Sequence, residues 1–180
     1  MLRNTSETWG WGAKALHWIG ALAILLLLGH GWWMTHLAPR GPDRLVHYAG
    51  HAALGYDVLV LIVLRVLWRW MNPVPALPAD SKPWEIWLAH LGHIGLYALM
   101  LVTTVLGWAL AGTMRTPMQK DIAGLTFPTI VADKTLHGSL EDWHKIAAYL
   151  LAALVLLHIA GALRHHFVKK NDVLRRMTAS

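Results

Sequence analysis

The chain has 180 residues, of which 56% are hydrophobic and only 14% charged, whereas a soluble domain carries about 25% charged residues. The apolar residues come in long blocks, which excludes an ordinary water-soluble enzyme and predicts an integral membrane protein of one domain. The net charge of +6 is ordinary where basic residues flank membrane spans, and without a basic face bearing stacking aromatics we expect no nucleic-acid partner.

Four segments are long and apolar enough to cross a hydrocarbon core about 30 Å thick. They are residues 13–34, 48–70, 87–112 and 143–167. The second and third are joined by NPVPALPADSKP, whose prolines predict a stiff, non-helical link. The connection 113–142 contains aromatic and apolar residues that predict packing on the membrane face. The first span is too long for a signal peptide core, so we expect it to be retained.

The lysines and arginines predict the orientation, because basic residues concentrate on the cytoplasmic side. One side of the predicted bundle holds Arg3, Lys14, Arg65, Arg69, Lys82, Arg164, Lys169, Lys170, Arg175 and Arg176. The other side holds Arg40, Arg44, Arg115, Lys120, Lys134 and Lys145. Ten against six predicts an all-α, integral membrane four-helix bundle with both termini cytoplasmic.

The most informative spacing in the chain separates His144 from His158 on the last span. Fourteen residues return a helical side chain to within about 40° of its starting azimuth, about 21 Å further along the axis. Two imidazoles in this arrangement are suitable ligands for two haems stacked along the helix. Any haem must be of the non-covalent b-type, because the chain has no cysteine. Matching the other histidines by depth pairs His17 with His158, and His51 with His144, as axial ligands.

Other histidines compete for these roles, and any single histidine near a helix end is more often an interfacial residue than a ligand. His47 lies one turn before His51, shares its face and could replace it. His165 shares the face of His158 but would lie near or beyond the membrane edge. The remaining histidines are expected to face elsewhere or to lie in loops: His30, His36 and His137.

Further polar residues lie within the spans, where ionisable groups are costly and so suggest function. His90 and His93 stand at adjacent turns, where they could bond haem propionates or a quinone carbonyl, or be interfacial histidines. Arg65 follows His51 by fourteen residues, at the depth of the inner haem. It could pair with a haem propionate or snorkel to the cytoplasmic boundary. Asp57 could relay a proton or cap a polar contact.

These residues resemble the bacterial cytochrome b561 family of four-span di-haem proteins over nearly the whole chain. The matching pieces are ALHW at His17, GHAALG at His51, VLRVLWR, NPVPALP, AHLGH, AGLTFP, DWH at His144, VLLH at His158, RHHF and KNDVLRRM. In the family, the haem ligands correspond to His17, His51, His144 and His158, in the pairs that depth gives.

The resemblance is close to members that oxidise superoxide, and it implies an inner-membrane protein that passes electrons from periplasmic superoxide to ubiquinone in the lipid. An electropositive entrance would speed encounter with the superoxide anion. The candidate residues for it are Arg40, Arg44, Arg115, Lys120, Lys134 and Lys145. One departure is that Glu141 and Asp142 precede His144, where we expect at least one basic residue, because carboxylates repel superoxide.

Three other functions stay open from the sequence. The chain could be a cytochrome that takes electrons from a quinol or a periplasmic donor protein. It could also be the membrane anchor subunit of a catalytic partner, as in hydrogenases and formate dehydrogenases. A histidine-rich metal-ion transporter is disfavoured, because the spans lack the broken helices and paired carboxylates of a divalent-ion path.

Overall fold

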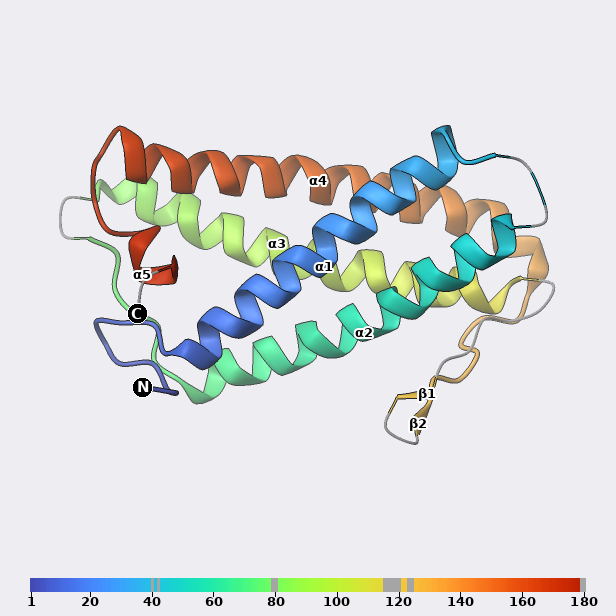
Figure 1. The fold of residues 1–180 in the computed structure, drawn as a ribbon, viewed down its shortest axis with the longest axis horizontal. Helices are drawn as coiled ribbons and strands as arrows, with labels where there is room; N and C mark the ends of the chain where they lie inside the picture. Colours follow the sequence, from blue (N-terminus) through green and yellow to red (C-terminus); the bar gives the residue numbers. More distant parts are fainter. Residues whose placement is uncertain (40, 42, 79–80, 115–120, 123–124, 179–180) are drawn as a thin grey trace.

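The computed structural model describes residues 1–39, 41, 43–78, 81–114, 121–122 and 125–178. Four long helices run side by side as a bundle: α1 (Trp11–His36), α2 (Arg44–Met71), α3 (Pro83–Gly112) and α4 (His137–Phe167) (Figure 1). The short helix η1 (Lys134–Leu136) precedes α4, and α5 (Arg175–Thr178) follows it. In the described ranges, strand is confined to β1 (Asp121–Ile122) and β2 (Leu125–Thr126), an antiparallel pair. The architecture is therefore all-α, as predicted.

The two ends of the bundle differ in what they carry (Figure 1). The termini end holds the N-terminus, the C-terminus and the α2–α3 connection, while the hairpin end holds the α1–α2 connection and the β1–β2 hairpin. Along the bundle, α1 packs on α2, α2 on α3, and α3 on α4. The pairs α1–α4 and α2–α4 are not extensively packed within the described helices.

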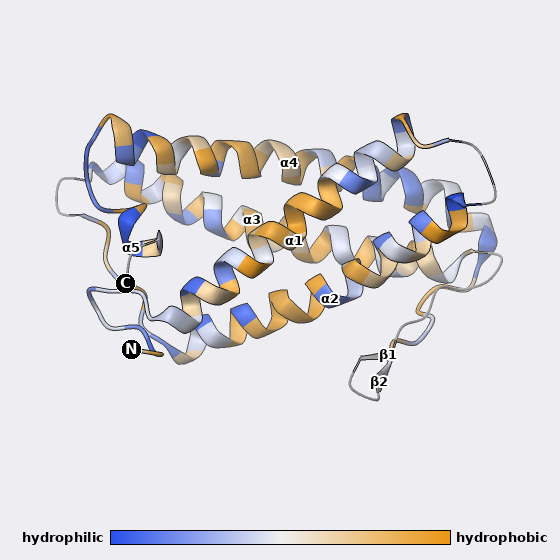
Figure 2. Ribbon diagram, in the orientation of Figure 1, coloured by the Kyte–Doolittle hydropathy of each residue, from blue (hydrophilic) through white to orange (hydrophobic). Residues whose placement is uncertain are grey.

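Each of the four long helices is apolar and long enough to cross a membrane. Leucine, isoleucine and valine side chains point outward along the whole bundle; Leu156 and Leu157, for example, are 67% and 68% exposed. Hydrophobic residues fill the middle of the helices and hydrophilic residues gather at both ends (Figure 2). This distribution suits lipid around the middle and water at the ends.

The helices are longer than the predicted spans because polar residues continue the helical backbone beyond the apolar blocks. The largest extension is at α4, which begins at His137 instead of residue 143, with the residues HGSLED forming its first turns. His36 and His137 were expected in loops, and this expectation is wrong. They are the last residue of α1 and the first of α4. The described part of the proline-rich link is non-helical, as predicted, except for its last residue, Pro83, which begins α3.

The interior is organised in three layers with a seven-residue spacing along every helix. The core layer contains one buried side chain from each helix: Ile24, Val58, Met100 and Leu151. Seven residues from these, on the termini side, lie the termini-end layer residues His17, Arg65, His93 and His158. Seven residues away in the other direction lie the hairpin-end layer residues Gly31, His51, Gly107 and His144. Two turns of helix separate successive layers by about 10 Å.

The termini end is held together by the chain segment that follows α4. Lys170 adopts a left-handed conformation (φ 54°), which turns the chain back under the bundle. Beyond this turn the backbone carbonyl of Met177 accepts a hydrogen bond from Trp18 of α1, at 2.8 Å. Arg176 donates to the carbonyl of Ala76 and to Asp172, and the second bond lowers the pKa of the Asp172 carboxyl and keeps it ionised.

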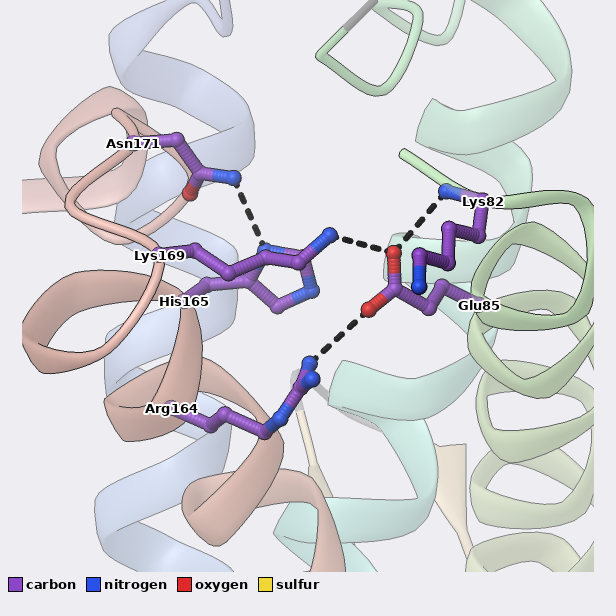
Figure 3. A network of polar contacts seen from close by, with 6 residues as sticks. All are labelled: Lys82, Glu85, Arg164, His165, Lys169 and Asn171. Atoms are coloured by element: carbon purple, nitrogen blue, oxygen red, sulfur yellow. Dashed lines mark hydrogen bonds and ion pairs between the residues drawn. The ribbon is translucent and has the colours of Figure 1, made fainter. Parts of the chain in front are cut away.

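A buried carboxylate clamps this segment to the start of α3 (Figure 3). Glu85 is 7% exposed and accepts hydrogen bonds from Arg164 of α4, at 2.9 Å, and from Lys169 just beyond it. It also accepts the backbone N–H of Lys82, at 2.9 Å, which caps the first turn of α3 next to Pro83. The Glu85 clamp therefore joins the two ends of the α3–α4 hairpin that lie far apart in sequence.

Candidate functional site

The hairpin-end layer brings His51 of α2 and His144 of α4 face to face. Their ring centroids are 6.2 Å apart and the ring planes lie at 86°. The Nδ1 atom of His144 donates to the backbone carbonyl of Thr103 on α3, at 2.9 Å, which leaves Nε2 as the nitrogen with a lone pair. The Nδ1 atom of His51 is buried and has no hydrogen-bond partner. The two rings thus present unused lone-pair capacity inside the bundle.

The termini-end layer brings His17 of α1 and His158 of α4 together in the same way. Their centroids are 6.3 Å apart, with the planes at 76°. His93 of α3 lies against His158 at 5.4 Å, and Arg65 of α2 donates to Nδ1 of His17 at 2.9 Å. Arg65 also donates to the hydroxyl of Tyr97, at 3.1 Å. All four helices therefore contribute to this layer.

Both centroid separations match those of imidazoles that bind one metal ion from opposite sides. Metal–nitrogen bonds of about 2.0–2.1 Å, with about 1.15 Å from each nitrogen to its ring centre, give about 6.3–6.5 Å between centroids. The pairs also bridge α1–α4 and α2–α4, which are not extensively packed against each other. A flat group held between two imidazoles needs helices that stand apart at that level. The separations are thus compatible with each pair of histidines holding one haem between them.

Gly20 of α1 borders a small open space beside the termini-end layer. Gly20 lies one turn after His17, is buried, and a Cβ built on it would meet no atom within 4 Å. A small cavity between α1, α2 and α3 is lined there by Gly20, Ile24, Val58, Arg65 and Met100, among others. The open side of α1 thus faces the space between the layers.

The contact between Arg65 and His17 sets a condition on that fit. A guanidinium only donates, so the contact requires a lone pair on Nδ1 of His17 and places the proton of a neutral ring on Nε2. Ligation through Nε2 reverses this tautomer, and Arg65 then needs another acceptor. A haem propionate is an acceptor of the kind that arginine prefers.

The other predicted site residues are placed as follows. His90 is exposed on α3, with Nδ1 bonded to the carbonyl of Ile86, so it is not brought together with the layers. His93 belongs to the termini-end layer. His47 lies against Trp33 at 4.8 Å, so His51 and not His47 faces His144. Among the described residues, no three His, Asp or Glu side chains are close enough to hold a metal ion together.

The predicted entrance for an anion is only partly covered by the described residues. Arg40, Arg115 and Lys120 lie outside them. Arg44 covers the ring of Tyr48, 5.5 Å from its centroid, and Lys134 begins η1. Glu141 forms an ion pair with Lys145, at 2.7 Å, so one of the two unexpected carboxylates is neutralised within α4.

Phe127 and Pro128 of the long connection after α3 pack onto the bundle. Phe127 lies against Tyr56 of α2, at 4.8 Å, and against Trp108 of α3, at 5.3 Å. The indole N–H of Trp108 donates to the carbonyl of Pro128, at 2.8 Å. This aromatic group holds residues 127–128 beside the hairpin-end layer.

Several residues at the site were not found from the sequence. His30 was expected to face elsewhere, but its ring lies 5.8 Å from that of His51. Gly31, Gly107 and Tyr97 were not identified as site residues at all. The signal was present for the two glycines, because Gly31 follows His17, and Gly107 follows His93, by the same fourteen residues that separate His144 from His158.

Comparison with known proteins gives consistent matches along the chain. The sequence model of a family described as prokaryotic cytochrome b561 matches residues 8–180. Cytochrome b561 homolog 2 of Escherichia coli (strain K12) is 29% identical over 180 residues, which cover 97% of this chain and 93% of that protein. Probable superoxide oxidase CybB of Yersinia pestis is 29% identical over 170 residues, 90% of each chain. A probable Ni/Fe-hydrogenase B-type cytochrome subunit of Azotobacter vinelandii is 23% identical over 199 residues, which cover 89% of this chain and 81% of that protein.

Proposed function

The chain belongs to the prokaryotic cytochrome b561 family of membrane proteins that bind b-type haem and transfer electrons, and from this premise we propose a specific activity for it. It holds two haems b in the bacterial inner membrane, oxidises superoxide at the hairpin end and reduces ubiquinone in the membrane. Both termini then lie in the cytoplasm and the hairpin end faces the periplasm.

The observation that carries this proposal is the pair of facing imidazoles in each of two layers, with separations of 6.3 and 6.2 Å. His17 and His158 would hold one haem, and His51 and His144 the other. Haem b, when bound, supplies reversible one-electron chemistry at its iron. The protein's part is to fix the imidazoles: the Thr103 carbonyl sets the tautomer of His144, and the core layer excludes water between the two levels.

Charge supports both the orientation and the direction of electron flow. Among the described residues, the termini end carries ten basic and three acidic residues, and the hairpin end three basic and five acidic, with Asp57 between them. The more basic end is the one expected in the cytoplasm. Arg65 places its positive charge beside the ligand His17, and nearby positive charge favours the reduced state. The termini-end haem would therefore be the electron acceptor of the two.

The proposed reaction balances when two superoxide anions are oxidised for each ubiquinone that is reduced. Two superoxide anions each lose one electron and leave as two dioxygen molecules. Ubiquinone takes the two electrons with two protons and becomes ubiquinol. Arg44 and Lys134 are described basic residues at the hairpin end that would attract the anion, whereas Glu141 and Lys145 pair with each other, so that neither contributes a net charge.

A second candidate function is favoured by the similarity to hydrogenase cytochrome subunits. In that case the chain would anchor a catalytic partner in the membrane and pass its electrons to quinone, without reaction with superoxide. The same two histidine pairs would serve both functions.

Two experiments test the proposal in order. A reduced-minus-oxidised spectrum with a pyridine haemochrome assay of the purified chain should give two haems b per polypeptide. Stopped-flow mixing of the oxidised protein with a superoxide pulse should then reduce the haem near the diffusion limit. A colourless chain or a single haem refutes the di-haem proposal. Two haems without reduction by superoxide leave the partner-linked function instead.

A further inference from the structure

The two histidines of the hairpin-end layer each lie against a glycine from a neighbouring helix. A Cβ atom built on Gly107 of α3 would lie 2.9 Å from Cε1 of His144 and 3.3 Å from its Nδ1. A Cβ atom built on Gly31 of α1 would lie 3.2 Å from Cε1 of His51. Cβ atoms essentially never approach ring atoms closer than about 3.0 Å, because packed interiors sit at van der Waals contact. Each imidazole thus occupies the space that a side chain would fill.

This close approach is particular to the hairpin-end layer. The matching positions in the termini-end layer are the histidines His17 and His93, on the same two helices. The same two helices also hold open glycines: a Cβ at Gly29 on α1 or at Gly92 on α3 would meet no atom within 4 Å. Within the described chain, Gly31 and Gly107 are the glycines whose added Cβ would meet a histidine.

His144 is held on two sides by one face of α3. Thr103 and Gly107 are one turn apart, and the first accepts the Nδ1–H of His144 while the second leaves room for the ring edge. The hydrogen bond fixes the tautomer, and the missing side chain fixes how far the ring can approach α3. Together they set where Nε2 points.

We propose that Gly31 and Gly107 are positioning residues that seat His51 and His144 for ligation of the haem in the hairpin-end layer. The inference rests on the proposed function, because it assumes that these histidines bind a haem. Adding a methyl group at Gly107 displaces the end of a side chain and no backbone atom. The fold should therefore survive the change, while the ligand moves. Ligands must be held to within about 0.5 Å, and loss of such support typically costs about 10–100-fold in metal affinity.

The test uses the full chain with Gly107→Ala and Gly31→Ala, and with Gly92→Ala and Gly29→Ala as matched controls on the same helices. Each is purified, checked for helix content by circular dichroism, and assayed for haem per chain, low-spin electron paramagnetic resonance signals and midpoint potentials. We expect about one haem per chain in Gly107→Ala, with the signal lost being the one that His144→Ala also loses. We expect two haems in Gly31→Ala, with a shifted signal for that haem. The controls should match the wild type.

The outcomes separate this inference from the proposed function. A wild type without two haems refutes both. Two haems in the wild type, with Gly107→Ala unchanged in haem content, resonance signals and potentials, refutes the glycine inference alone. If Gly107→Ala does not accumulate as folded protein, Gly31→Ala decides, and its identity to Gly29→Ala in all three measurements overturns the proposal.

Discussion

Arg65 offers the most quantitative test of the site. Replacing it by alanine removes a positive charge whose Nη2 lies 2.9 Å from Nδ1 of His17. Reduction adds an electron to the haem, and a nearby positive charge stabilises that state. Arg65→Ala should therefore lower the midpoint potential of the termini-end haem and leave the other nearly unchanged.

The size of the shift follows from distance. The observed contact, about 2.2 Å across the imidazole and about 2.0 Å for a metal–nitrogen bond together give about 7 Å between the charge and the iron, and we use the same distance for Arg65 after ligation has turned it from Nδ1 of His17 to another acceptor at that level. Two unit charges at that distance interact by about 2.4 kcal/mol at an effective dielectric constant of about 20. At about 59 mV per tenfold change in a one-electron equilibrium, this is about 100 mV.

A potentiometric titration followed in the α-band measures both potentials. Arg65→Lys, which keeps the charge, should stay near the wild type, and Arg175→Ala on the exposed helix α5 is the control for a distant cation. Potentials unchanged within about 20 mV in Arg65→Ala, with both haems present, would refute the assignment of Arg65 to the termini-end haem.

Three further changes test other parts of the structure. An alanine replacement in either histidine pair should remove the haem of that pair and spare the other; equal loss of both haems from every folded single mutant contradicts the pairing. Glu85→Gln should speed proteolysis of the chain after α4, because Arg164 and Lys169 lose their carboxylate, whereas Glu141→Gln, at an exposed pair, should not. Phe127→Ala should expose the connection between α3 and α4 to protease without changing haem content, since the ring packs on the helices outside the layers; unchanged cleavage there contradicts that packing role.

The apolar blocks predicted the existence and order of the four helices, because transfer of apolar residues into lipid depends on local composition alone. The helix ends were less predictable. Backbone hydrogen bonds continue into polar turns outside the apolar region, so α4 begins at His137 and α2 at Arg44. Hydropathy marks the membrane boundary and not the end of the helix.

The histidine pairs could be proposed from depth because two imidazoles on one helix fix two levels. Depth does not give the rotation of each neighbouring helix about its own axis, and this rotation decides which of its side chains face each histidine pair. His30 projects from a different side of α1 than His17. Its ring nevertheless lies 5.8 Å from that of His51, because His51 belongs to α2, which packs against α1. The roles of Gly31, Gly107 and Thr103 depend on side-chain and backbone contacts across helices, for which a single sequence contains only the spacing.

The last helix supplies one imidazole to each level of the bundle. Neither binding level exists until the ribosome has completed α4 and the insertion machinery has placed it beside α3. Before that, the first three helices lie in the bilayer without a complete histidine pair at either level. Under the proposed di-haem function, capture of the cofactors is the closing step of biogenesis, and a translation product truncated before α4 retains neither haem.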